Sequence, residues 1–169
     1  MIGGIRRSPT DNAYGFFALV PYVRPMHEVE VSSVVLPAAP ELLEQLSPRA
    51  ILESAEIYEI LEASADGTEF SVSVEEDEMT VAFTELEDGY EYTFVDGGGT
   101  FEERYSRLTV EGGSETRVTA VTRYSFQSRW SFVLNRLGAG TVTTELETTI
   151  YNLVQRTYAD ESDAEPHDA

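Results

Sequence analysis

The sequence predicts an α+β domain in which an antiparallel β-sheet has one face covered by a long C-terminal helix. Two observations support this prediction. From residue 56 to residue 126, apolar and polar residues alternate, which is typical of strands with one buried face. From residue 130 to residue 158, apolar residues recur every three or four positions, which is typical of an amphipathic helix. A chain of 169 residues is long enough for one domain with one core.

A first strand and two short helices are expected before the alternating region. In HEVEVSSVV, residues 27–35, an extended chain places Val29, Val31 and Val35 on one side. Residues 36–55 carry leucines at helical spacing and are interrupted by Ser47-Pro48. Because proline ends one helix and suits the first turn of the next, we expect two short helices here.

The alternating region divides into six strands separated by short turn sequences. No connection is long enough for a crossover helix, so the strands are predicted to be antiparallel neighbours. Two-residue turns at Glu76-Asp77 and Glu87-Asp88 would pair Phe70 with Phe83, and Phe83 with Tyr92. This register places nine apolar residues on one face, which then requires a cover: Phe70, Val72, Val74, Met79, Val81, Phe83, Tyr90, Tyr92 and Phe94.

The inward side of FEERYSRLTVE, residues 101–111, is ambiguous in the sequence. A three-residue turn before this strand points Arg104 inward, and a two-residue turn points Tyr105 and Arg107 inward instead. A β-bulge would allow residues of both sets to face the interior. An inward arginine could anchor a carboxylate or enolate oxygen, whereas an outward one would form a cross-strand surface pair.

The segment RLGAGTVTTELE, residues 136–147, has two interpretations. A glycine-rich turn can bind phosphate at the start of a helix, but the same glycines can also lie inside a longer helix. Apolar residues continue at helical spacing on both sides, no strand leads into the segment, and the chain has no lysine. We therefore predict one helix from Trp130 to Tyr158, in which Gly138 and Gly140 lower helix stability and leave room for a cavity beside the sheet.

The charge of the chain is strongly negative. There are 31 acidic residues against 11 arginines, which gives a net charge of −20. Such a surface repels nucleic acid, and its self-repulsion is relieved only by concentrated salt, so we expect a halophilic protein without a nucleic-acid partner. With no cysteine and only two histidines, we expect no metal site and no cofactor. The acidic run Glu75–Glu78 is interpreted as a solvated hairpin.

Both ends of the chain differ from the predicted domain, residues 26–158. Residues 1–25 contain three arginines and one aspartate, a net charge of +2, and are expected to be a disordered extension. A targeting signal is the alternative for this segment. Residues 159–169 are expected to be a disordered acidic tail. No apolar stretch is long enough to span a bilayer, so we expect a cytoplasmic protein without stable membrane insertion.

The predicted order of elements, and several segments, resemble the START-like superfamily, whose members are also called SRPBCC or helix-grip proteins. The resemblance spans residues 26–158 and is carried by HEVEVSSVVLPAAPELLEQL, ETRVTAVTRYSF and LGAGTVTTELETTIYNLVQ. It is greatest for the small acidic members from halophilic archaea. The resemblance implies a seven-stranded antiparallel sheet wrapped around a long C-terminal helix, with ligands held between them. The superfamily shares no catalytic motif, so no catalytic residue is assigned.

A ligand pocket between sheet and helix needs apolar walls and a few polar groups. Its candidate residues come from the predicted inner face, from the ambiguous strand and from the start of the helix. They are Phe83, Tyr92, Phe94, Arg104, Tyr105, Tyr124, Leu137, Gly140 and Thr141.

Three functions are compatible with this pocket. The first is the binding or carriage of a hydrophobic small molecule such as a lipid, a quinone or a polyketide-like ring. The second is a polyketide cyclase or dehydratase, which several polar side chains meeting at one point would favour. The third is an interaction domain with a filled core and no ligand.

Overall fold

A computed structural model describes residues 26–95, 101–126 and 131–163 of the chain. The elements follow the predicted order of one strand, two short helices, six strands and a long helix. The strands are β1 (His27–Val35), β2 (Glu59–Ala63), β3 (Glu69–Val74), β4 (Asp77–Leu86), β5 (Gly89–Phe94), β6 (Phe101–Glu111) and β7 (Thr116–Phe126). The helices are α1 (Ala39–Gln45), α2 (Pro48–Ser54) and α3 (Ser131–Asp163).

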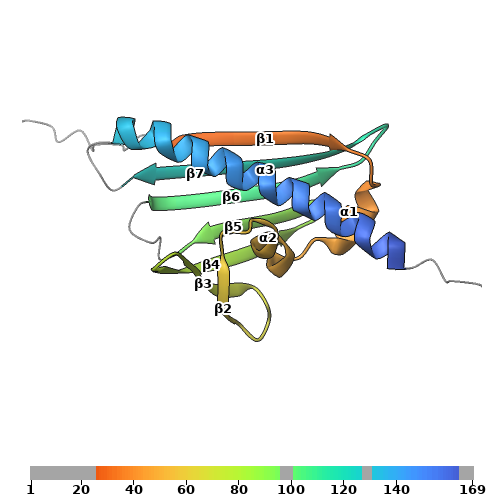
Figure 1. The fold of residues 1–169 in the computed structure, drawn as a ribbon, viewed down its shortest axis with the longest axis horizontal. Coiled ribbons are helices and arrows are strands. Elements are labelled where there is room, and N and C mark those ends of the chain that lie inside the picture. Colours follow the sequence, from red (N-terminus) through yellow and green to blue (C-terminus); the bar gives the residue numbers. More distant parts are fainter. Residues whose placement is uncertain (1–25, 96–100, 127–130, 164–169) are drawn as a thin grey trace, which may run out of the picture.

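The seven strands form one antiparallel sheet in the order β1-β7-β6-β5-β4-β3-β2. Helix α3 crosses the inner face of this sheet diagonally, as Figure 1 shows in blue, and contacts β1, β7, α1 and α2. The buried core lies between these layers and includes residues from the sheet, from both short helices and from α3. The predicted helix-grip architecture is therefore confirmed.

The predicted pairing of β4 with β5 is confirmed, because Phe83 lies opposite Tyr92. The predicted turn between β3 and β4 is wrong by one residue. Val74 pairs with Asp77, so Glu75 and Glu76 form the turn, and Glu75 adopts a positive φ of 57°. Because this change shifts the pairing by two residues, the predicted face of each side chain is unchanged. The acidic run has no glycine or asparagine to mark the turn position.

The two short helices begin with different capping contacts. In α1 the carboxylate of Glu41 accepts a hydrogen bond from the backbone N–H of Ala38, at 2.9 Å. In α2 the Ser47 hydroxyl accepts one from the backbone N–H of Ala50, at 3.2 Å, and Pro48 occupies the first turn. The break predicted at Ser47-Pro48 is thus confirmed, and the two helices cover the inner face beside α3 (Figure 1).

Helix α3 runs without interruption through Gly138 and Gly140, so the prediction of a helix rather than a phosphate-binding turn is confirmed. It continues to Asp163 and so extends past Tyr158, where the predicted helix ends. Trp130, the predicted first residue, lies outside the described residues.

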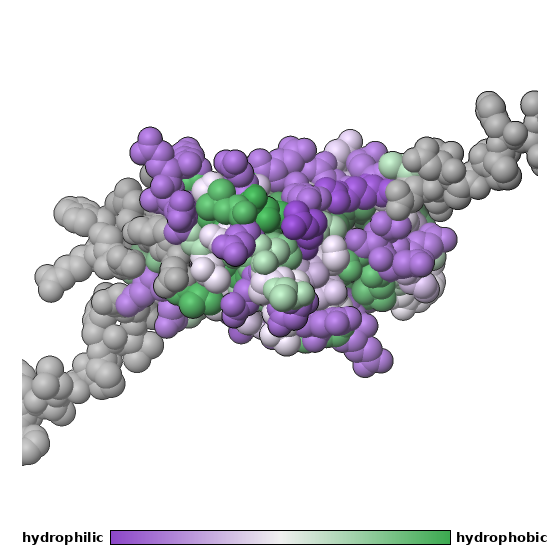
Figure 2. Space-filling model, turned by 90° about the horizontal axis from the view of Figure 1, so that it is seen from below, coloured by the Kyte–Doolittle hydropathy of each residue, from purple (hydrophilic) through white to green (hydrophobic). Residues whose placement is uncertain are grey.

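The space-filling view in Figure 2 shows hydrophilic residues over much of the face that it presents, with smaller hydrophobic patches between them. The expected N-terminal extension, residues 1–25, lies outside the described residues, as do residues 164–169. Within the described ranges, none of the helices is both long enough and apolar enough to cross a bilayer.

Candidate functional site

Arg104 on β6 points into the interior of the protein. A β-bulge between Phe101 and Glu103 shifts the register of β6 against β7. Because of this bulge, Phe101 and Arg104 both lie on the inner side, although they are three residues apart in the chain. The Arg104 side chain is 7% exposed. Of the alternatives open in the sequence, the bulged arrangement with an inward Arg104 is the one observed.

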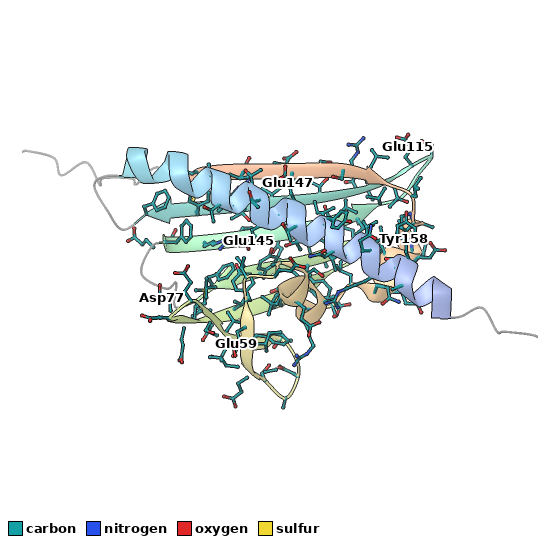
Figure 3. All side chains as sticks on the ribbon, viewed as in Figure 1. Glu59, Asp77, Glu115, Glu145, Glu147 and Tyr158 are labelled. Atoms are coloured by element: carbon teal, nitrogen blue, oxygen red, sulfur yellow. The ribbon has the colours of Figure 1, made fainter. Side chains whose placement is uncertain are left out.

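Arg104 forms a closed polar cluster with Glu145 of α3 and Tyr58, which precedes β2. The Nη2 atom of Arg104 lies 2.5 Å from Oε2 of Glu145, and Nη1 donates to the Tyr58 hydroxyl at 3.2 Å. The Tyr58 hydroxyl in turn donates to Oε1 of Glu145 at 2.7 Å. Three elements that are distant in sequence therefore meet at one point of the core. Figure 3 marks Glu145 near the middle of α3.

Aromatic rings surround the guanidinium group of Arg104. Its central carbon lies 4.4 Å from the ring centre of Phe94 and 5.4 Å from that of Phe101. Tyr58 also packs against Phe94, with ring centres 5.9 Å apart. Within the described part of the chain, the buried Nε of Arg104 has no hydrogen-bond partner. The site thus combines apolar walls with one unused, charge-assisted donor.

The electrostatics keep this cluster ionised at Arg104 and protonated at the tyrosines. Burial alone would lower the pKa of Arg104, but the Tyr58 hydroxyl and the Glu145 carboxylate together hold it above its usual value. Burial is the main reason that the pKa of Tyr58 is raised well above its usual value. Burial, and then the charge of Glu145, raise the pKa of Tyr92 from 10.0 to about 12. The tyrosine hydroxyls therefore remain hydrogen-bond donors throughout the neutral range.

Five of the predicted pocket residues lie on the inner face of the sheet and are buried. They are Phe83, Tyr92, Phe94, Arg104 and Tyr124. Phe83 stacks on Tyr92 with ring centres 5.0 Å apart, and Tyr92 packs edge-on against Phe94 at 6.0 Å. These rings form a continuous aromatic floor that leads to Arg104.

Three other predicted pocket residues lie elsewhere. Tyr105 is on the outer face of β6, where its hydroxyl hydrogen-bonds Glu91, because Arg104, Ser106 and Leu108 alternate inward. Gly140 and Thr141 are exposed, because they lie on the side of α3 that faces away from the sheet. Leu137 lies in the first turns of α3, where only the backbone is described.

The expected cavity beside the glycines of α3 is not supported at Gly138. A methyl group at this position would lie 2.9 Å from Cζ of Phe126, so the glycine allows close packing and leaves no room there. A separate crevice between α1, β6, β7 and α3 has a volume of about 10 Å³, which is room for about one water molecule. Its walls include Leu46, Leu108 and Leu153.

The sequence interpretation missed Tyr58 and Glu145. Glu145 has a sequence signal, because it follows Val142 by three residues and so lies on the inward stripe of α3. Its side chain is 4% exposed, whereas Glu147 lies on an exposed side of the helix. Tyr58 has no such signal, since its position depends on how the chain leaves α2. Among the residues that the structure describes, no group of three potential ligands is placed to hold a metal ion.

Comparison with known proteins finds similarity at the level of structure. No model of a protein family matches the chain, and no curated protein sequence matches it. A START superfamily protein from Mycobacterium smegmatis superposes with a TM-score of 0.61 and 15% identity, over 79% of this chain and 98% of that one. A norcoclaurine synthase from Thalictrum flavum, solved as a point mutant with a transition-state analogue, has a TM-score of 0.60 and 12% identity. That match covers 79% of this chain and 98% of the synthase chain.

A third structure, that of a protein from Thermus thermophilus, has a TM-score of 0.56 and 17% identity, over 80% of this chain and 99% of that one. At these identities the comparisons establish the fold alone. The sheet order, the diagonal α3 and these superpositions agree, and the chain therefore has the helix-grip fold of the START superfamily.

Proposed function

We propose that this protein binds a hydrophobic small molecule between the inner face of the sheet and α3, with a polar group of the ligand at Arg104. The observation that carries the proposal is the buried Nε of Arg104, which has no partner among the described residues and lies between aromatic rings. Apolar walls with a few converging polar groups are characteristic of small-molecule sites.

The energetics of the ion pair support a binding role. Moving a carboxylate and a guanidinium out of water costs several kcal/mol each, and their attraction often only offsets this cost. An apolar pair of similar volume would fill the same space without that penalty. Selection for stability alone therefore does not account for Arg104 and Glu145, and a ligand that uses the remaining donor does.

A second candidate function is a cyclase- or dehydratase-like reaction at the same place. It is favoured by the convergence of Tyr58, Arg104 and Glu145 at one point. Tyr58 is held protonated, so its hydroxyl would donate a hydrogen bond to a substrate oxygen, and Arg104 would stabilise a developing enolate oxygen. The same site thus supports binding as its first property, with turnover as an additional one.

Two fluorescent dyes of the same shape test the binding proposal. Anilinonaphthalene sulfonate carries an anionic group, and N-phenylnaphthylamine is its neutral counterpart. We expect both dyes to bind one to one in concentrated KCl, the sulfonate about tenfold more tightly because a charged acceptor meets the Arg104 donor. In Arg104→Met/Glu145→Met, which removes both charges together, the neutral dye should still bind and the advantage of the sulfonate should disappear.

The matched control is Arg107→Met, which removes an arginine of the outer face that pairs with Glu91. It should leave both affinities unchanged. Absence of saturable binding by either dye would contradict the proposal and favour a filled core. If the dyes do bind, native mass spectrometry of the protein from its own host, purified in concentrated salt, would identify the ligand class.

A further inference from the structure

A row of inward side chains crosses three adjacent strands next to the polar cluster. His27 of β1 lies opposite Tyr124 of β7, and Tyr124 lies opposite Arg104 of β6. Neighbouring strands are spaced by about 4.8 Å, so the backbones of His27 and Arg104 lie roughly 10 Å apart across the sheet. Tyr124, which is fully buried, lies between them.

Both ends of this row carry a buried nitrogen that has no partner among the described residues. One is Nε of Arg104, and the other is Nε2 of His27. Unsatisfied polar atoms of this kind are rare in protein interiors and call for a specific explanation. Helix α3 packs against β1 and β7, and Arg104 bonds Glu145 of the same helix. Both nitrogens therefore lie on the side of the sheet that α3 covers.

The side chains between the two nitrogens are aromatic. The His27 ring lies 5.6 Å from the ring of Tyr124 and 5.8 Å from that of Phe126. Phe101 packs edge-on against Tyr124 at 5.3 Å, and the central guanidinium carbon of Arg104 lies 5.4 Å from the Phe101 ring centre. A flat ring system is the ligand shape that packs best among such rings.

We propose that the row His27–Tyr124–Arg104 recognises a flat, elongated aromatic or conjugated molecule that carries an oxygen atom at each end. One oxygen, a carbonyl or phenolic oxygen, accepts from Nε of Arg104. The other oxygen, from a hydroxyl or a carbonyl group, forms a hydrogen bond with Nε2 of His27. An imidazole nitrogen can be either a donor or an acceptor. This inference rests on the proposed function and narrows it to ligands with two polar ends about 10 Å apart.

Three probes of equal width separate the two levels of the proposal: biphenyl, its p-hydroxy derivative, and p,p′-biphenol. The protein is the full chain in concentrated KCl, and affinity is measured by quenching of intrinsic fluorescence or by calorimetry. We expect the monophenol to bind more tightly than biphenyl. We expect the biphenol to bind about fivefold more tightly than the monophenol, beyond the advantage of having two equivalent ends.

The variant His27→Phe keeps an aromatic ring and removes the nitrogen. It should abolish the extra affinity of the biphenol and leave the monophenol unchanged. His27→Gln, which retains a polar group, should restore part of the difference and serves if the first variant is unstable. Tyr105→Phe, on the outer face next to Arg104, is the control and should change neither affinity.

The outcomes are distinguishable. If none of the three probes binds, both this inference and the proposed binding function are overturned. If the monophenol binds but the second hydroxyl adds nothing, or if its contribution persists in His27→Phe, only the two-ended recognition is wrong. The two-ended recognition is supported if the biphenol loses its advantage in His27→Phe and keeps it in Tyr105→Phe.

Discussion

Arg104 holds together three parts of the fold through polar contacts in the core. Its guanidinium reaches Glu145 on α3 and Tyr58 before β2, so one side chain of the sheet contacts both the long helix and the connection between α2 and β2. The charged pair is almost fully enclosed, with side chains 7% and 4% exposed. Interactions of this kind stabilise a structure little as a pair but cost much when one partner is removed.

Replacing Arg104 by methionine is expected to destabilise the protein by about 3–5 kcal/mol, because it leaves the Glu145 carboxylate buried without its counter-ion. The double variant Arg104→Met/Glu145→Met should recover most of that loss. Urea unfolding in constant, concentrated KCl measures both. Arg107→Met is the comparison, and it should cost little stability because its pair with Glu91 is exposed to solvent. A double variant as unstable as the single one would contradict the ion-pair explanation.

The raised pKa of Tyr92 predicts that the folded protein loses stability at alkaline pH. Burial raises the pKa of Tyr92 from the usual 10.0 to about 12 in the folded protein, so only the unfolded chain releases the proton between these values. Stability is therefore complete below pH 10 and falls by about 2–3 kcal/mol as the pH rises to about 12. Unfolding free energies of wild type and Tyr92→Phe, compared across this range, should show a shallower decline in the variant. Parallel pH profiles would argue against it.

At the scale of single elements, the two glycines of α3 have different environments. Gly140 is exposed, and a methyl group there would contact nothing within 4 Å. Gly138 faces the sheet, where a methyl group would meet the buried ring of Phe126. The helix therefore tolerates one glycine and needs the other for close approach.

Gly140→Ala is expected to stabilise the protein by up to about 1 kcal/mol through helix propensity. Gly138→Ala should destabilise it by about 1–3 kcal/mol, because Phe126 stacks on Phe101 and has little freedom to move. Thermal melts of the two single variants make the comparison, and adding Phe126→Leu to Gly138→Ala should relieve part of the loss. Equal stabilisation by both alanines would show that Gly138 does not mediate a close contact.

At the scale of the whole molecule, charge is the dominant property. A net charge of −20 on 169 residues favours expansion of the chain unless salt screens it. The ion pairs that involve exposed arginines, such as Arg123 with Glu28, are solvated and contribute little.

We expect the melting temperature to rise steadily from about 0.1 M to about 3 M KCl, because screening weakens the repulsion among carboxylates. A variant in which several exposed glutamates of the outer sheet face are changed to glutamine should melt higher in dilute salt and depend less on KCl. A melting temperature that is independent of salt would contradict the halophilic interpretation.

The sequence by itself determined the order of the elements and the face of the sheet on which each residue of β3, β4 and β5 lies. Alternation with a period of two is a local property of a strand, and it survives even a turn displaced by one residue, as at Glu75. The helical spacing through Gly138 and Gly140 likewise predicted one continuous helix. The alternative, a phosphate-binding turn, would need a strand leading into it and a lysine, and the sequence has neither there.

Only the tertiary structure decided which polar groups meet. The bulge before Arg104 depends on how β6 pairs with β7, and Tyr58 reaches the site only because of the path from α2 to β2. The neighbourhood of His27, Tyr124 and Arg104 joins residues separated by up to 97 positions in the chain. Such contacts arise from the pairing of distant strands, and no local pattern in the sequence encodes the distance between two side chains that belong to different strands.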